Sequence, residues 1–198
     1  MREMIDMEFF DLIKNRRSIR RYKSQSVHKE DILKILDAAN WAPSAMNRQP
    51  WEFLVISGEL LKPLGNSYKG VIEEFISKME NDSEIISSEK FVKFAAHFGG
   101  APVVIVVLAE TNEDPREQKA FLESASAAME NLVLAAGDMG LGTCWMTGPL
   151  RDESNLRRIL DISPDKEIVA VTPLGYPDET PHPTPRTEVK NKIKWIGW

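Results

Sequence analysis

The apolar run "APVVIVVLAE" at residues 101–110 places the strongest constraint on the fold. It is much shorter than the roughly 18 apolar residues that a membrane-spanning helix requires. A short run dominated by β-branched residues is typical of a strand that is buried on both of its faces. The sequence therefore predicts a strand at 101–110 in the interior of the protein.

Signals for helices and strands alternate along the rest of the chain, with no internal repeat. Short β-branched segments predict further strands at residues 51–57, 141–147 and 167–175. Helical spacing predicts helices at residues 7–15, within 28–43, at 117–140 and at 151–162, with a mobile helical excursion at 59–98. With 198 residues, 42% of them hydrophobic, the chain is expected to form one domain, residues 1–198.

The overall charge and the rarity of metal-binding residues argue against several classes of protein. A net charge of −5 argues against general binding to nucleic acid or to anionic membranes. Cys144 is the only cysteine and there are three histidines, so neither a disulfide framework nor a zinc site is expected. The N-terminal residues lack the apolar stretch of a signal peptide, and no run is long enough to span a membrane. We therefore expect a soluble, cytoplasmic protein.

The segment "RRSIRRY", residues 16–22, concentrates positive charge in an acidic chain. Such a cluster is compatible with a nucleic-acid patch, a solvated helix end or a pocket for one small anion. Guanidinium groups are permanently charged, fork-shaped donors that match a phosphate, and the Ser18 hydroxyl adds another donor. A nucleic-acid patch would be expected to spread further and to include exposed aromatic residues. The pattern therefore favours a phosphate pocket.

A second polar segment, "WAPSAMNRQPWEFLVIS" at residues 41–57, lies between a predicted helix and a predicted strand. Pro43 and Pro50 restrict the backbone, and Ser44 and Asn47 offer a hydroxyl and an amide. Such groups are suited to hydrogen-bonding a planar heterocycle, although a well-capped loop has the same pattern. Together the two segments indicate a phosphorylated heteroaromatic ligand.

Motifs of other nucleotide-binding folds are missing. The only Gly-x-Gly pair, Gly140 and Gly142, follows a predicted helix and precedes a strand, which is not the order of a Rossmann motif. A Walker loop is also absent. Cys144 lies within a predicted strand and has no histidine nearby in sequence, so it is interpreted as a buried structural thiol. No catalytic side chain is nominated.

Five segments together resemble the FMN-dependent nitroreductase-like oxidoreductases. They are "RRSIRRY", "APSAMNRQPWEFLVI", "ASAAMENLVLAAGDMGLGTCWMTGP", "PLGYP" and "PTPRTEV". They follow one another in the family's order from about residue 9 to residue 189.

The resemblance implies an α+β fold in which helices flank a central, mainly antiparallel sheet. It also implies an intertwined homodimer with two FMN sites at the subunit interface, where the helix at 117–140 makes the main contact. Residues 59–98 would form a variable helical cover over the flavin. Residues 186–198 would form an arm that docks on the partner subunit.

The same resemblance assigns the cofactor to the arginine segment. Four residues of this segment would hold the FMN: Arg16, Arg17, Ser18 and Arg20. Of these, Arg16 and Ser18 would face the phosphate and ribityl chain, and Arg20 would face the N1 and C2 carbonyl edge of the flavin. Arg186 would be a further phosphate ligand.

Two more segments would contact the flavin ring by this resemblance. One is a turn that reaches across the dimer to the other subunit's flavin and carries Pro43, Ser44, Ala45 and Asn47. The other is the pair Thr147 and Gly148, which would lie along the isoalloxazine with a backbone N–H toward N5.

The chain departs from the family pattern at two positions. Ala45 replaces the second serine of the turn, which leaves only a backbone contact available there. Thr184 stands where many relatives carry a lysine, and Arg17 or Arg21 would compensate for the lost charge.

The implied activity is that of an FMN-dependent NAD(P)H oxidoreductase. NADH or NADPH would deliver hydride to N5 of the flavin and leave. A small-molecule electron acceptor, such as a nitroaromatic or a quinone, would then take its place in a ping-pong cycle. Two alternatives remain: a specialised family member that catalyses dehalogenation, flavin fragmentation or enoyl reduction, and an FMN-binding protein without turnover.

Overall fold

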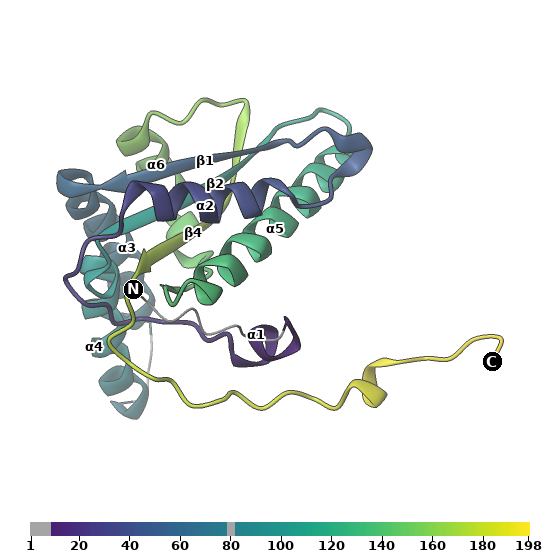
Figure 1. Cartoon of the computed structure of the whole chain (residues 1–198). Coiled ribbons are helices and arrows are strands. Elements are labelled where there is room, and N and C mark those ends of the chain that lie inside the picture. Colours follow the sequence, from purple (N-terminus) through teal and green to yellow (C-terminus); the bar gives the residue numbers. More distant parts are fainter. Residues whose placement is uncertain (1–8, 79–81) are drawn as a thin grey trace.

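A four-stranded sheet with the strand order β1-β2-β4-β3 forms the centre of the protein (Figure 1). This computed structural model describes residues 9–78 and 82–198, and only the backbone of residues 82–88. The strands are β1 (Trp51–Ser57), β2 (Val103–Glu110), β3 (Gly142–Thr143) and β4 (Lys166–Gly175). All three pairings are antiparallel, as the family resemblance implies.

Strand β2 lies inside the sheet and is buried on both faces, which confirms the prediction for residues 101–110. Because side chains alternate along a strand, its residues divide between two apolar cores. Val104, Val106 and Leu108 belong to one core, and the residues between them belong to the other. The uninterrupted apolar sequence is thus the consequence of two cores that share one strand.

Helices cover both faces of this sheet (Figure 1). On one face lie α2 (Lys29–Asn40) and α5 (Pro115–Asp138), which pack on each other. On the other face lie α3 (Leu61–Ile76), α4 (Asp82–His97) and α6 (Glu153–Leu160). The short helix α1 (Phe9–Asn15) contacts α5, and residues 7 and 8 of the predicted helix lie outside the described residues.

The helical character predicted within residues 59–98 is confirmed by the helices α3 and α4, and residues 79–81 lie outside the described part of the chain. The predicted mobility of this segment stays a prediction. The two helices cross closely at Gly65, where an added Cβ would lie 2.1 Å from the carbonyl oxygen of Ala96. Glycine is therefore required at this crossing.

The predicted strand at 141–147 is much shorter in the structure. Only Gly142 and Thr143 pair as a strand, and Met146 makes an isolated bridge to Val171. The amide of Cys144 donates to the hydroxyl of Thr172 at 3.2 Å rather than to a backbone carbonyl. This side-chain bond interrupts the ladder between the two backbone pairings.

Small residues of α5 pack within the chain itself. Ser124, Ala125 and Ala128 are buried, and the amide of Ala45 donates to the Ser124 hydroxyl at 3.2 Å. Close approach of α2 and the following turn explains these residues. In this part of α5, only Ser126 and Ala127 remain partly exposed.

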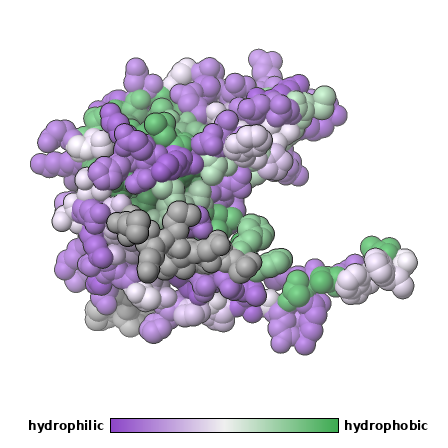
Figure 2. Space-filling model, viewed as in Figure 1, coloured by the Kyte–Doolittle hydropathy of each residue, from purple (hydrophilic) through white to green (hydrophobic). Residues whose placement is uncertain are grey.

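The C-terminal segment runs away from the body of the protein and carries hydrophobic residues into solvent (Figures 1 and 2). Trp195 and Trp198 are 68% and 97% exposed, and their rings meet edge to face with the centroids 5.5 Å apart.

Within the described ranges, no helix combines the length and the apolar character that crossing a membrane demands.

Candidate functional site

The arginine segment is fixed to the sheet by two buried side chains. Ile19 and Tyr22 are 7% and 6% exposed, and the Tyr22 hydroxyl donates to the Ile19 carbonyl at 2.6 Å. The amide of Ile19 donates to the carbonyl of Thr143 at 2.8 Å, which aligns the segment with β3. With the apolar residues turned inward, the arginines of "RRSIRRY" remain partly or fully exposed.

A polar pocket of about 150 Å³ lies against this segment. Distant parts of the sequence meet there, because residues 181–186 of the C-terminal segment form its other wall. Its lining consists of Arg16, Arg17, Ser18, Arg20, Pro181, His182, Thr184 and Arg186. No carboxylate is among these lining residues. Four guanidinium groups, a histidine and two hydroxyls form the donor set expected for a phosphate.

The structure distinguishes the two arginines proposed to compensate for Thr184. Arg17 lines the polar pocket, as Thr184 does. Arg21 instead pairs with Asp178 at 3.3 Å and does not line the pocket. Of the two arginines, only Arg17 therefore shares this pocket with Thr184. His182, which the sequence reasoning did not single out, also lines this pocket.

A second pocket of about 310 Å³ adjoins the polar pocket, and Arg20 lines both. Most of its wall is apolar and comes from α3, α4 and residues 144–151. Thr147 and Gly148 are part of this wall. The remaining lining residues are Tyr68, Val71, Ile72, Phe75, Phe91, Phe94, Cys144, Trp145, Met146 and Arg151.

The two titratable groups deepest in this second pocket stay neutral at ordinary pH. Burial raises the pKa of Tyr68 to about 12, against a smaller opposing effect of Arg20. Burial also raises the pKa of the Cys144 thiol, although Arg20 and a hydrogen bond with Ser18 counteract it. Because the thiolate is the reactive form, this agrees with a structural rather than a nucleophilic cysteine.

The turn that carries Pro43, Ser44, Ala45 and Asn47 lines neither of these pockets in the described part of the chain. Its expected place at a second subunit's flavin stays a prediction. The turn is held in an unusual conformation, since Met46, Asn47 and Gln49 have φ of 53°, 55° and 49°. Positive φ in such residues costs free energy and persists only where neighbours impose it.

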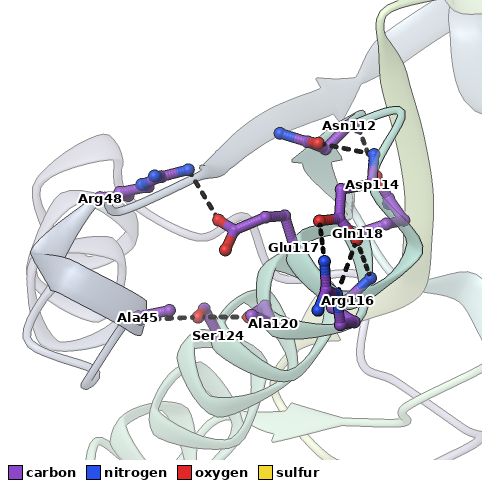
Figure 3. A network of polar contacts seen from close by, with 9 residues as sticks. All are labelled: Ala45, Arg48, Asn112, Asp114, Arg116, Glu117, Gln118, Ala120 and Ser124. Atoms are coloured by element: carbon purple, nitrogen blue, oxygen red, sulfur yellow. Dashed lines mark hydrogen bonds and ion pairs between the residues drawn. The ribbon is translucent and has the colours of Figure 1, made fainter.

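Two contacts with α5 fix this turn (Figure 3). The Ser124 hydroxyl accepts the amide of Ala45 and donates to the carbonyl of Ala120 at 2.6 Å. Arg48 pairs with Glu117 at 2.9 Å. The amide of Ala45 is thereby already bonded within the chain, which limits the backbone contact that this position was expected to offer.

The aromatic wall of the second pocket was the part of the site that sequence reasoning missed. Phe75, Phe91 and Phe94 lie on α3 and α4, where helical periodicity alone does not tell core from pocket. Arg151 was also missed, because one arginine at the start of a predicted helix is ordinary.

Within the described residues, no cluster of three or more His, Cys, Asp or Glu side chains could hold a metal ion.

Comparison with known proteins identifies the family of this chain. The nitroreductase family model matches residues 13–176. A protein of Methanothermobacter thermautotrophicus, provisionally named NADH dehydrogenase/NAD(P)H nitroreductase, is 34% identical over 88% of this chain and 80% of its own length. The iodotyrosine deiodinase of Thermotoga neapolitana is 29% identical, with 91% of this chain and 94% of that protein covered.

A solved structure extends the similarity to the whole fold. The crystal structure of an oxidised iodotyrosine deiodinase bound to FMN and 3-iodo-L-tyrosine superposes with a TM-score of 0.78. It is 28% identical to this chain, and the match covers 96% of this chain and 99% of the deiodinase. The two pockets joined at Arg20 and the matched residues 13–176 lead to one conclusion: the chain belongs to the nitroreductase family.

Proposed function

We propose that this protein is an FMN-dependent NAD(P)H oxidoreductase that reduces small acceptors such as nitroaromatics and quinones. The observation that carries the proposal is the pair of pockets that share Arg20. One has four arginines and no carboxylate among its lining residues, and the other is walled by aromatic and aliphatic side chains. A ligand with a phosphate at one end and a planar ring at the other matches this division.

The residues present fit FMN. Arg16, Arg17, Ser18 and Arg186 line the pocket proposed for the phosphate. Arg20 lines both pockets and would therefore hold the cofactor where its ribityl chain meets the ring. We assign all five residues to cofactor binding.

The residues beside the ring bind and orient rather than react. FMN, when bound, supplies hydride acceptance from NADH or NADPH and its return to an acceptor. Arg20 would stabilise negative charge at the N1 edge, and the backbone at Thr147 and Gly148 would lie along the ring. Tyr68 and Cys144, both buried and neutral, exclude water from the floor of the pocket.

A homodimer would complete the site. The turn at 43–47 would then serve the partner's flavin, residues 59–98 would cover the ring, and residues 186–198 would dock on the partner. The exposure of Met46 at 88% and of Trp198 at 97% supports this arrangement, because large apolar side chains are rarely left in solvent in such number without a partner surface.

Reductive dehalogenation of an aromatic substrate is the second candidate activity. The similarity to iodotyrosine deiodinase, in sequence and in fold, favours it. The same two pockets would serve this reaction, so the cofactor assignment does not depend on the choice between them.

The deciding experiment begins with the flavin content of the purified protein. We expect stoichiometric FMN, bleaching of its absorbance by NADH or NADPH without oxygen, and reoxidation by one acceptor class among nitroaromatics, quinones and halogenated tyrosines. Bound FMN that neither nicotinamide reduces would indicate a binding protein without turnover. A protein without affinity for FMN would contradict the proposal.

A further inference from the structure

Arg151 places a second cation, besides Arg20, at the second pocket. It lies in the 3-10 helix Gly148–Asp152 and its guanidinium stacks over the ring of Phe75, 5.8 Å from the centroid. Arg20 stacks over Phe91 in the same way at 5.9 Å. Both phenylalanines are partly exposed, so the two arginines and their rings form the mouth of the pocket.

The charge of Arg151 is not balanced by its acidic neighbours. Asp152 accepts hydrogen bonds from Ser67 at 2.6 Å and from Asn155 at 2.8 Å. Glu153 pairs with Arg157 at 2.7 Å. Among the residues whose side chains the structure describes, no carboxylate forms an ion pair with Arg151, and none lines this pocket.

FMN as proposed above uses Arg20 and leaves Arg151 without a role. The rings of Tyr68, Phe75 and Phe94 offer faces and edges to a planar aromatic molecule. A guanidinium held against a ring keeps its N–H groups ordered for a carboxylate, because stacking restricts the side chain without using its donors. The pocket thus combines a surface for an aromatic ring with one ordered, unassigned cation.

We propose that Arg151 selects aromatic acceptors that carry a carboxylate and binds that carboxylate directly. This inference rests on the proposed function and names the substrate class of the same site. The phosphates of the nicotinamide donor are a second source of negative charge for Arg151, and the experiments below separate the two. Arg158, an exposed arginine of α6 that does not line the pocket, provides a matched control.

Binding is measured first, by calorimetric titration of the purified protein with benzoate and with its neutral analogue benzamide. Calorimetry requires neither flavin reduction nor turnover, so it remains informative if the proposed function fails. We expect benzoate to bind more tightly, and Arg151→Gln to reduce the benzoate-to-benzamide affinity ratio roughly tenfold, the effect of losing one charge-assisted contact at a partly exposed site. Arg151→Lys should retain part of the preference, and Arg158→Gln all of it.

Kinetics then distinguish the acceptor from the donor. For 4-nitrobenzoate against 4-nitrobenzamide, Arg151→Gln should lower the ratio of kcat/KM about tenfold. An unchanged ratio in both binding and kinetics would overturn the proposal. A second result would also overturn it: Arg151→Gln lowers the apparent affinity for NADPH tenfold but leaves the kcat/KM ratio of the two acceptors at its wild-type value. Arg151 would then bind the donor's phosphate.

Discussion

Ile19 packs directly on the backbone of Gly142, where an added Cβ would lie 2.8 Å from Cγ1 of the isoleucine. This contact joins the arginine segment to β3, and the hydrogen bond from the Ile19 amide to Thr143 fixes its register. The position of the arginines therefore depends on a residue that lines neither of the two pockets described above.

Gly142→Ala is expected to displace the arginine segment. The new methyl group must push Ile19 or the backbone of residues 16–22 away, and such overpacking costs about 1–3 kcal/mol of stability. Urea unfolding should show the loss, and titration with FMN should show weaker binding. Wild-type FMN affinity in a destabilised Gly142→Ala protein would show that the segment does not position the cofactor's ligands.

Two glycines of α3 should respond to alanine in opposite directions. At Gly65 an added Cβ would lie 2.1 Å from the Ala96 carbonyl oxygen, so Gly65→Ala should separate α3 from α4 and cost about 1–3 kcal/mol. At Gly70 nothing lies within 4 Å, so Gly70→Ala should stabilise the helix by about 0.4–1 kcal/mol. Thermal unfolding of both variants tests this, and equal shifts would contradict the close crossing.

Arg20 and Arg186 should differ in what their loss changes. Arg20 lines the second pocket, which is proposed for the flavin ring. Arg20→Ala should therefore lower the flavin reduction potential by on the order of 30 mV. For a two-electron couple this equals a tenfold loss of preference for the reduced state. Arg186 lines only the polar pocket, so Arg186→Ala should weaken FMN binding about tenfold at unchanged potential. Potentiometry and dialysis measure the two effects.

Arg21→Gln is the control for both variants, since Arg21 belongs to the same segment and pairs with Asp178 outside the two pockets. It should retain FMN and its potential. An Arg20→Ala protein whose potential equals that of Arg21→Gln would remove Arg20 from the ring site.

The residues of "RRSIRRY" that line the polar pocket could be singled out from the sequence because they sit in one short motif. The spacing of Ile19 and Tyr22 in "RRSIRRY" decides which side chains point inward. The flanking arginines therefore lie at the surface. Arg186 could be added only through the family resemblance, because it lies at least 164 positions further along the chain than this segment.

The aromatic pocket and the short strand β3 could not be predicted in the same way. Which faces of α3 and α4 line a pocket depends on how closely the helices cross at Gly65, and a glycine in sequence does not reveal its partner. The end of β3 depends on the Thr172 hydroxyl, which belongs to a strand 28 residues away from Cys144. Both features arise from tertiary contacts that override local propensity.

Removal of residues 187–198 should change the assembly rather than the fold. All of these residues are exposed, and they include Val189, Ile193, Trp195, Ile196 and Trp198. If the segment docks on a second copy, the shortened protein should dissociate at concentrations where the full chain is a dimer, with little change in its circular dichroism. Sedimentation velocity measures the masses, and two species of equal mass would contradict the proposed arm.

Asp152 should make the stability of the α3–α6 contact depend on pH. Hydrogen bonds from Ser67 and Asn155 lower the pKa of its carboxyl below the usual value of 3.8. A group whose pKa is lower in the folded state contributes stability above the unfolded pKa, and this stability is lost as the pH falls through the folded pKa.

Asp152→Asn should therefore cost about 1 kcal/mol of stability at pH 7. This is the low end of the range for charged hydrogen bonds, because the side chain is partly exposed. The difference from wild type in urea unfolding should shrink below pH 3.8. A cost that is equal at pH 7 and pH 3 would show that Asp152 acts through packing and not through its charge.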